Sequence, residues 1–391
     1  MTTYFYVEPT DTLFVRGNLA FGDAGEHGAS LMPPPPSLFA GAFRSALLGR
    51  NADEMTAFLA RGRCDDAHLA TCLGTPENPG EFRITWLSLA GWKAGETLPE
   101  ALTPLPADLL RLESGFAPLK PRPTGDLVAS AGDLPMRATL IAAKQEKPRS
   151  GYYLRQTGLA RHLQGQVPDN EAAVEARHLH ERDPRLGIGL DAQSRSVQEG
   201  LIYTTEGYAF SPASAAEITR PYASTGFLVG IAGADDLLPD TGLLRLGGDG
   251  RSARYRRVQF QPPHVEGVPG AGGRFRLILQ TPALFPQGWL PDGVSREGDE
   301  FRLCGSGFTA RLACAAVGRR EVISGWDLFH WKPKPAQAAV PAGSVYWFDD
   351  FTGDPGKLAE WVAGGLWSHN PDRTRRAEGF NNALLAAWPQ D

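Results

Sequence analysis

The sequence has few cysteines and no long hydrophobic run, and both absences narrow the class of protein. Four cysteines occur among 391 residues, and they form two widely spaced pairs, Cys64 with Cys72 and Cys304 with Cys314. Neither pair has the two- to four-residue separation of a zinc knuckle. No apolar run approaches the about 20 residues that cross a bilayer, and the opening MTTYFYVEPTDTLF lacks the features of a signal peptide. We therefore expect a cytoplasmic protein with reduced thiols and no membrane contact.

An excess of basic charge is also lacking. The chain has 39 lysines and arginines against 44 acidic residues, which gives a formal net charge of −5. Proteins that bind nucleic acids over a broad surface usually have a strongly basic balance, so any anionic partner of this chain must be held by local cationic clusters. The motifs of zinc proteases, P-loops and nucleophile elbows do not occur. The sequence therefore predicts neither a metal nor another cofactor.

Glycine and proline, in contrast, are abundant, with 45 and 32 residues. They indicate many turns and irregular connections rather than long helices. The content of 42% hydrophobic and 21% charged residues is typical of globular proteins. The length is sufficient for about two domains and a large insertion.

The order of the predicted elements indicates an α+β fold. The first half is expected to contain, in order, a strand at 3–8, a helix from Ser37 as N-cap to Gly49, strands at 200–210 and 226–233, a helical or turn segment at 235–246, and a strand at 252–260. This order is that of the ferredoxin-like split βαβ unit. Residues from about 50 to 185 are an irregular insertion in this interpretation, with helices at 51–63 and 170–180.

A second unit is expected after the proline- and glycine-rich connection at 262–273. It starts with a strand at 274–285, continues with FTARLACAAV and GSVYWFDDF as strands, and has a helix from Lys357 to Leu366. The prediction is two ferredoxin-like domains in tandem, the first at 1–265 with the insertion and the second at 266–391.

The first predicted helix follows four prolines, Pro33 to Pro36, which form a stiff, extended lead into it. One side of this helix is a stripe of small and basic residues, namely Ser37, Gly41, Arg44 and Ser45. A glycine in such a stripe lets another backbone come close. The long polar loop before the helix contains Arg16 and Asn18, and loops of this length are often functional.

The glycine-rich segment LRLGGDGR does not match a dinucleotide-binding fingerprint, because its glycines precede a strand. It forms either a phosphate-binding nest or an ordinary tight turn. Four arginines follow in the predicted strand, and alternation places two of them on one face: Arg251, Arg254, Arg256 and Arg257, with Arg254 and Arg256 sharing a face. Arginine suits phosphate binding and base stacking, although a solvated edge strand would have the same pattern.

Histidines and tryptophans give weaker signals. His27, in the long loop, would suit a general base for RNA cleavage, but no partner for it can be placed. The pair His178 and His180 lacks a third metal ligand and is expected on a surface helix or loop. The segment GWDLFHWKPKP at 325–335 suits partner docking or packing better than RNA contact.

Seven segments occur in an order that is similar to a known family. They are EPTDTLFVRGNLAFG, PPPPSLFAGAFRSALL, ERDPRLGIGLDAQSRSVQEGLIYTTE, LGGDGRSARYRRV, TPALFPQGWLP, GWDLFHWKPKP and VPAGSVYWF. Together they resemble the Cmr-complex subunit 3 of type III-B CRISPR effectors, a member of the RAMP superfamily. The resemblance implies two ferredoxin-like domains in a non-catalytic scaffold. Such subunits cap the foot of the effector, hold the 5′ tag of the guide RNA, and dock the large polymerase-like signalling subunit and the first backbone RAMP subunit.

The family's glycine-rich loop matches Gly247, Gly248 and Gly250, with Asp249 where glutamate is common. Near its end the chain has AEGFNNALLAAW where relatives tend to have a glycine-rich stretch, so RNA contact is not implied for that segment. A subunit that contacts a few nucleotides does not need a basic net charge, because phosphate contacts position the RNA locally.

We therefore predict a guide-RNA-binding and assembly subunit without catalytic activity. Its predicted RNA-binding residues are Arg16, Asn18, Arg44, Gly247, Gly248, Gly250, Arg251 and Arg254. One alternative is a RAMP endoribonuclease that processes precursor guide RNA with His27 as general base. Another is a purely structural interaction module, in which charge reversal at Arg251 and Arg254 weakens assembly but leaves RNA affinity unchanged.

Overall fold

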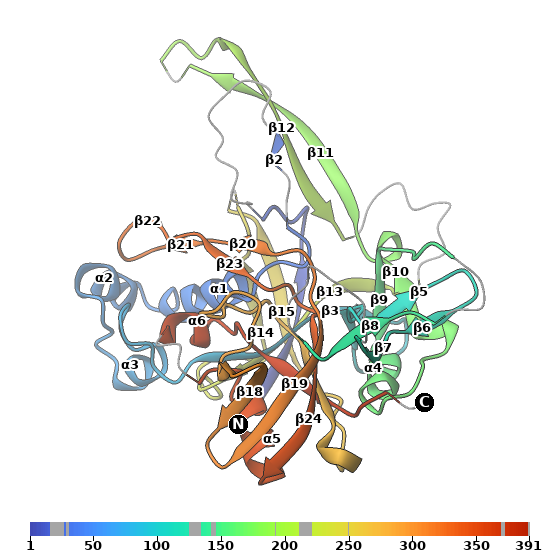
Figure 1. The fold of residues 1–391 in the computed structure, drawn as a ribbon. Helices are drawn as coiled ribbons and strands as arrows, with labels where there is room; N and C mark the ends of the chain where they lie inside the picture. The colour runs from blue at the N-terminus through green and yellow to red at the C-terminus, as the bar shows by residue number, and fades with distance from the viewer. Residues whose placement is uncertain are drawn as a thin grey trace.

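Two large antiparallel sheets form the body of the molecule, one from each half of the chain (Figure 1). The computed structural model describes residues 1–15, 27–28, 31–124, 134–141, 146–191, 193–210, 221–248, 250–368 and 372–389, with the backbone alone at 27–28 and 198–203. Arg16, Asn18 and Asp249 lie outside the described residues. None of the helices in the described ranges is long and apolar enough to span a bilayer.

The first sheet has eight strands in the order β10-β9-β4-β3-β13-β1-β15-β14. In chain order they are β1 (Thr2–Pro9), β3 (Arg83–Trp92), β4 (Glu100–Pro104), β9 (Tyr152–Arg155), β10 (Ala173–Glu175), β13 (Ser224–Ala232), β14 (Thr241–Arg245) and β15 (Ser252–Val258). The strands predicted at 3–8, 226–233 and 252–260 are confirmed as β1, β13 and β15.

The segment from 50 to 185 is less irregular than the sequence suggested, because it contributes four strands to this sheet. β3 pairs with β13 along its whole length and is buried on both faces over most of its residues. A strand buried on both faces lacks the apolar–polar alternation that identifies a half-exposed strand. The helix predicted at 170–180 is wrong: single 3-10 turns at Asn170–Ala172 and Ala176–His178 flank β10 there.

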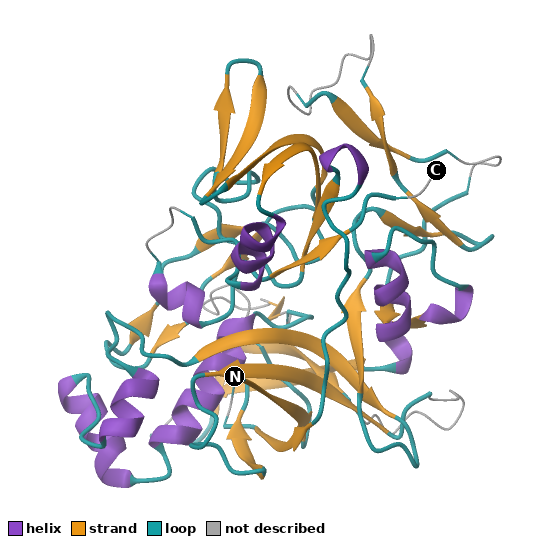
Figure 2. Cartoon of the chain, turned by 90° about the horizontal axis from the view of Figure 1, so that it is seen from below, coloured by secondary structure: helices purple, strands orange, loops and turns teal. Residues whose placement is uncertain are grey.

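Three helices, α1 (Pro36–Leu48), α2 (Ala52–Arg61) and α3 (Ala67–Leu73), gather at one side of the first sheet (Figure 2). α1 packs on the sheet through aromatic pairs, with the Phe39 ring 4.9 Å from that of Phe227 and the Phe43 ring 5.4 Å from that of Phe5. The predicted helix is confirmed, but its N-cap is Pro35 and Ser37 lies inside it. Proline at the first helical position has no N–H that needs a capping acceptor.

The second sheet has six strands in the order β17-β18-β19-β24-β16-β25. They are β16 (Phe275–Leu279), β17 (Val294–Glu297), β18 (Glu300–Gly305), β19 (Phe308–Ala316), β24 (Val345–Gly353) and β25 (Ala383–Ala386). The connection from β24 to β25 contains α5 (Pro355–Ala363) and α6 (Arg373–Ala377), so the helix predicted from Lys357 is confirmed with a start two residues earlier.

Four strands have the same relative order in both sheets, β3-β13-β1-β15 in the first and β19-β24-β16-β25 in the second. A complete split βαβ unit also needs a helix in each of its two crossovers. Within the described residues, helices lie in the crossovers from β1 to β3 and from β24 to β25, but not in those from β13 to β15 and from β16 to β19. The segment predicted as helix or turn at 235–246 is a turn followed by β14. The mixed α+β architecture is therefore confirmed, and two complete ferredoxin-like domains are not.

The two sheets share an apolar cluster, which joins the halves into one interior. Tyr6 and Leu228 of the first sheet and Val345 and Trp347 of the second are buried in it, together with one side of α4 (Gln156–Leu163). A buried ionic cluster lies at the same junction. Its members come from both halves: Asp108, His162 of α4 and Arg276 of β16.

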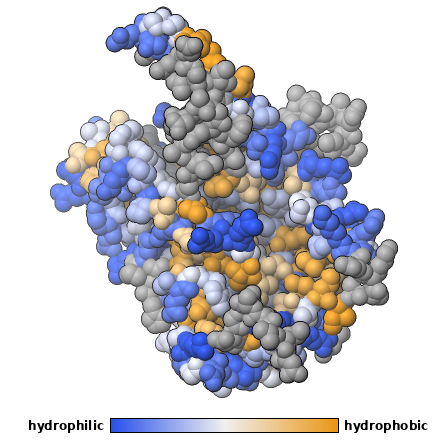
Figure 3. All heavy atoms as spheres, turned by 45° about the horizontal axis from the view of Figure 1, so that its top comes forward, coloured by the Kyte–Doolittle hydropathy of each residue, from blue (hydrophilic) through white to orange (hydrophobic). Residues whose placement is uncertain are grey.

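A long hairpin of β11 (Glu181–Leu190) and β12 (Val197–Ala209) projects from the body (Figure 1), and β2 (His27–Gly28) pairs with β12 in parallel. Apolar side chains are exposed along it (Figure 3), namely Leu186, Ile188, Leu190 and Val197. The strand predicted at 200–210 is part of β12. Smaller hairpins are β5 (Leu109–Arg111) with β6 (Phe116–Pro118), β7 (Lys120–Pro123) with β8 (Met136–Thr139), β20 (Glu321–Ile323) with β23 (Gln337–Ala339), and β21 (Trp326–Asp327) with β22 (Lys332–Pro333). The four cysteines are free thiols, as expected.

Candidate nucleic-acid interface

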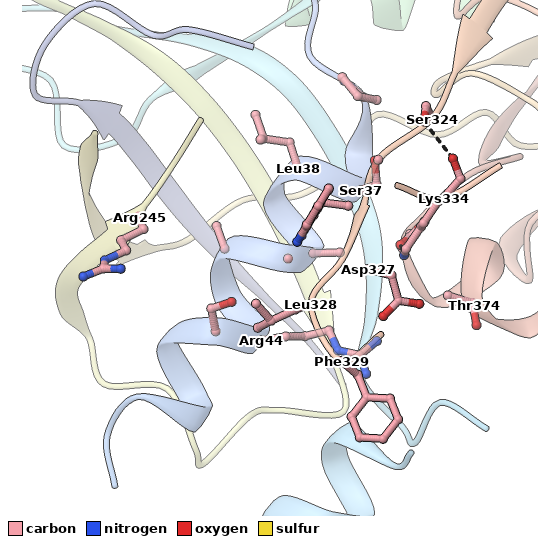
Figure 4. A pocket seen from close by; sticks show the side chains of 18 of the residues that line it. Ser37, Leu38, Arg44, Arg245, Ser324, Asp327, Leu328, Phe329, Lys334 and Thr374 are labelled. Atoms are coloured by element: carbon pink, nitrogen blue, oxygen red, sulfur yellow. Dashed lines mark hydrogen bonds and ion pairs between the residues drawn. The ribbon is translucent and has the colours of Figure 1, made fainter. Parts of the chain in front are cut away.

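An open groove of about 1660 Å³ crosses the exposed side of α1, and we call it the α1 groove. The predicted stripe of small and basic residues lines it, with Ser37, Gly41, Arg44 and Ser45 all contributing. β14 and the glycine-rich turn after it form one bank, and the flap of residues 321–339, with α6, forms the other. Figure 4 shows Arg44 on α1 beside Phe329 of the flap, with Arg245 of β14 on the other side of the helix.

The flap is attached to α2 through Phe329 and to the end of α6 through Lys334, which gives the groove a fixed wall. Lys334 forms an ion pair with Glu378, just after α6, and Glu378 also accepts a hydrogen bond of 3.0 Å from Arg375. The Phe329 ring contacts that of Phe58 in α2, with centroids 6.4 Å apart. The second half of the chain therefore contributes a wall to a groove whose floor belongs to the first half.

Arg44 is a cation without a counter-ion of its own. Its guanidinium donates a hydrogen bond of 3.1 Å to the Leu73 carbonyl, and no carboxylate within the described ranges forms an ion pair with it. Burial lowers the pKa of Arg44, and the charge of Glu378 opposes this shift. Lys334 and Arg375 already engage Glu378, so Arg44 is free to pair with an anion that enters the groove.

The groove is cationic although the chain is acidic overall. Its charged lining comprises five cations and three carboxylates, namely Arg44, Arg50, Arg245, Lys334 and Arg375 against Asp327, Asp372 and Glu378. Arg245 is exposed, and within the described part of the chain it makes no ion pair or side-chain hydrogen bond. Arg44 and Arg245 are thus the two lining cations best placed to receive an anion.

The glycine-rich turn connects β14 to β15, so it joins two strands rather than a helix and a strand. Gly247 has φ +87°, and a Cβ there would lie 2.6 Å from the Phe14 carbonyl oxygen. The Gly248 N–H donates a hydrogen bond of 2.8 Å to the same oxygen. Gly247 and Gly248 line the groove, whereas Gly250, at φ +67°, does not. Because the Gly248 N–H is engaged, it cannot also cradle a phosphate.

Arg251 lies at the base of the projecting hairpin rather than in the α1 groove. Its guanidinium pairs with Asp11, which also faces Arg185 of β11 at 3.6 Å. Arg185 in turn pairs with Asp183 at 2.7 Å. These residues fasten the hairpin to the end of β1, and this contact accounts for Arg251 structurally.

Arg254 is exposed on β15, on the same face as Arg256, as the alternation predicted. Arg256 stacks over the Trp92 ring at 4.0 Å, whereas Tyr255 points to the opposite face and contacts Phe43 of α1. Arg254 and Arg44 therefore lie on opposite faces of the first sheet. For Arg16 and Asn18, which lie outside the described residues, the nearest described neighbour is Val15, and Val15 lines the groove.

The comparisons with known proteins identify the family. A family model described as CRISPR-associated protein (Cas_Cmr3) matches residues 5–388. The chain belongs to this family. The resemblance to subunit 3 of type III-B Cmr complexes is thereby confirmed. No curated protein matches.

Solved structures are similar to this Cas_Cmr3 chain at low sequence identity. A chain in the cryo-EM structure of the Type III-B Cmr-beta bound to cognate target RNA and AMPPnP, state 1, is 15% identical with a TM-score of 0.50, over 96% of this chain and 93% of that chain. A chain in the Cmr-beta structure bound to cognate target RNA is 15% identical with a TM-score of 0.49, over 97% and 96%. At this identity the first likeness shows a common fold.

Several features of this Cas_Cmr3 chain were missed from the sequence. If the segment TGLLR had been predicted as a strand, alternation would have placed the Leu244 side chain in the core and the Arg245 side chain at the surface. Arg245 could then have been recognised as a candidate. His180 is buried against Tyr208 rather than on the surface, and burial lowers its pKa to about 4. No cluster of three metal-binding side chains occurs in the part of the chain that is described.

Proposed function

We propose that this Cas_Cmr3 chain is a non-catalytic subunit of a type III-B effector. In this proposal it binds the 5′ tag of the guide RNA in the α1 groove, and it docks the large signalling subunit and the first backbone subunit. The observation that carries the RNA assignment is Arg44, a partly buried cation that lines an open groove and forms no ion pair with any described carboxylate.

A phosphate in the groove would supply the counter-ion that Arg44 lacks among the described residues. Bidentate guanidinium–phosphate contacts are among the stronger hydrogen bonds in proteins. Gly41, one turn before Arg44, is exposed, and apart from the helix's own backbone no described atom lies within 4 Å of the position that a Cβ would take. This open position gives a sugar–phosphate backbone room to approach α1 closely, next to the positive charge of Arg44.

We also infer that each sheet is a ferredoxin-like unit that keeps helices in only one of its two crossovers. The common strand order in the two halves supports this inference. In each half a crossover helix, α1 or α5, packs on one face of the sheet, and the shared apolar cluster covers the opposite face, where Tyr6 alternates with the helix-facing Phe5.

The RNA assignment is tested in the assembled complex with a tagged guide. The variant combines Arg44→Ala and Arg245→Ala, and the matched control is Arg122→Ala, at an exposed arginine of β7 that does not line the groove. We expect the double variant to lower guide affinity and to reduce the log–log slope of affinity against salt by about 0.7 for each phosphate that it no longer neutralises. Native mass spectrometry confirms the subunit content. An unchanged affinity and slope in an intact complex would show that the groove does not bind the guide.

The non-catalytic part of the proposal has a separate test. Repeat RNA is incubated with the wild-type chain and with His27→Ala, and the products are resolved on a sequencing gel. We expect no cleavage by either protein. Cleavage that disappears in His27→Ala would instead establish the endoribonuclease alternative.

A further inference from the structure

Two tryptophans stand out from the flap at the turn between β21 and β22. Trp326 is 52% exposed and Trp331 is 71% exposed. Their rings meet edge to face, with centroids 5.5 Å apart and planes at 87°. We call residues 326–333 the tryptophan turn. Side chains of this size are seldom so exposed in a soluble protein unless the surface binds something.

The tryptophan turn is held rigidly by its own contacts and by the body of the molecule. The Asp327 carboxylate accepts hydrogen bonds of 3.0 Å from both the backbone N–H and the ring Nδ1 of His330. Phe329 packs on Phe58 of α2, and the Lys334 N–H donates a hydrogen bond of 2.9 Å to the Gly325 carbonyl. The two indoles are therefore presented on a fixed loop, so little conformational entropy is lost when they bind a partner.

The charges around the turn favour a protein partner over RNA. Asp327 lies within the turn, and Glu77 lies 3.9 Å from the Nε2 of His330, so carboxylates adjoin the indoles. At the indoles these carboxylates oppose the approach of phosphates, whereas in the α1 groove, which Asp327 also lines, the cations outnumber the carboxylates. Lys332 is exposed and makes no ion pair with any described residue, so one cation beside the indoles is available to a carboxylate of the partner.

The geometry of the two indole rings also favours a protein partner over RNA. A base is gripped best between parallel ring faces, and two rings at 87° in mutual contact leave no slot between them. Perpendicular rings in contact instead form a compact apolar knob. Tryptophan is among the residues that most often dominate the binding energy of a protein interface when inserted into a partner's pocket.

We propose that the tryptophan turn is an anchor for another protein subunit of the effector. The surface that it fits is an apolar pocket with at least one carboxylate at its rim, opposite Lys332. This proposal rests on the docking part of the proposed function. Trp326 also lines the α1 groove, whereas Trp331 does not, so the tests are made at Trp331.

The direct test places a photo-reactive group at the turn. The change Trp331→p-benzoylphenylalanine is introduced into the assembled, guide-loaded complex, which is then irradiated and analysed by mass spectrometry. We expect one cross-linked product, between this chain and a peptide of another protein subunit that contains apolar and acidic residues. A cross-link to RNA would overturn the proposal, and so would the absence of any cross-link to protein.

A second test measures subunit retention. In the variant Trp331→Ala, we expect at least about tenfold weaker retention of the partner subunit, because indole anchors commonly contribute that much or more. The control is Ile141→Ala, a change at another highly exposed apolar residue, and Trp331→Phe should restore most of the retention. Equal retention in Trp331→Ala and the control would contradict the proposal.

The two proposals fail in distinguishable ways. If the groove assignment is wrong, Arg44→Ala leaves guide affinity unchanged while the tryptophan variant still loses its partner. If the anchor assignment is wrong, the tryptophan variant keeps its partner while Arg44→Ala still weakens guide binding. A melting temperature equal to that of the wild-type chain confirms that the exposed substitutions leave the fold intact.

Discussion

Asp108 has no exposed surface, and its carboxylate holds the two halves of the molecule together. The Asp108 carboxylate lies 2.8 Å from the Nε2 of His162 and forms an ion pair with Arg276. Arg276 also donates hydrogen bonds to the His162 carbonyl at 2.6 Å and to the Ala387 carbonyl at 2.7 Å. Every charge in the cluster is thus paired, and a buried charge is tolerable only in this condition.

Removal of one partner from this cluster should be costly. We expect Arg276→Met to lower the free energy of unfolding by about 3–5 kcal/mol, because it leaves the Asp108 carboxylate buried with less compensation. The matched control is Arg302→Met in β18, whose partly exposed pair with Glu300 should contribute at most about 1 kcal/mol. Urea unfolding at neutral pH measures the free energy of unfolding of both variants and of the wild-type chain. Equal losses in the two variants would show that the cluster does not stabilise the junction.

The same cluster should make stability depend on acid. Burial raises the pKa of Asp108, but the charges of His162 and Arg276 lower it more, to about 2. The unfolded pKa is about 3.9, so the contribution of this group is complete above about pH 4 and is lost as the pH falls towards 2. We expect Asp108→Asn to flatten the fall in unfolding free energy across that window. The same pH slope in both proteins would contradict this origin of the acid sensitivity.

At the scale of elements, α1 contains a residue that weakens it as a helix. Gly41 is exposed inside the helix and makes no close approach to any described atom, so nothing within the described chain requires a glycine there. Glycine costs roughly 1 kcal/mol relative to alanine inside a helix. An approach by a partner backbone accounts for this otherwise unfavourable residue.

At position 41, one substitution is expected to raise the stability of the chain and to weaken guide binding. Gly41→Ala should raise the unfolding free energy of the chain by about 0.5–1 kcal/mol, because alanine favours the helix. It should also weaken guide binding, because the added methyl group occupies space that the sugar–phosphate backbone needs. Ser45→Ala, on the same stripe, adds no bulk and serves as the control. A Gly41→Ala complex that binds the guide as well as the control would remove the close-approach argument.

The elements also differ in how far the sequence could predict them. α1 was predicted because it has one exposed and one buried side, which produces a clear period. β1 was predicted from its aromatic and β-branched residues, although its three central residues are buried on both faces of the strand. β3 was missed because it is buried on both faces, and the helix expected at 170–180 became β10 because Val174 pairs with Tyr153. The stripe of α1 was predicted from its helical spacing. The partner of Arg251 could not be predicted, because Asp11 lies 240 residues away in the sequence and contacts Arg251 only in the folded sheet.

At the scale of the whole molecule, the second half completes the site that the first half begins. The flap contacts α2 through Phe329 and pairs with the residue after α6 through Lys334, so the α1 groove exists only when both halves are in place. The molecule can therefore be acidic overall and still present a cationic groove, because the few cations that matter are gathered from distant parts of the chain.

The central claim is that Arg44 binds the tag of the guide, and one measurement tests it most directly. Affinities of the assembled wild-type and Arg44→Ala complexes are compared for guides with and without the 5′ tag, as a double-mutant cycle. We predict that Arg44→Ala weakens binding of the tagged guide and leaves binding of the tagless guide unchanged. An equal effect of the substitution on both guides, or no effect on either, would contradict the assignment of the tag to the α1 groove.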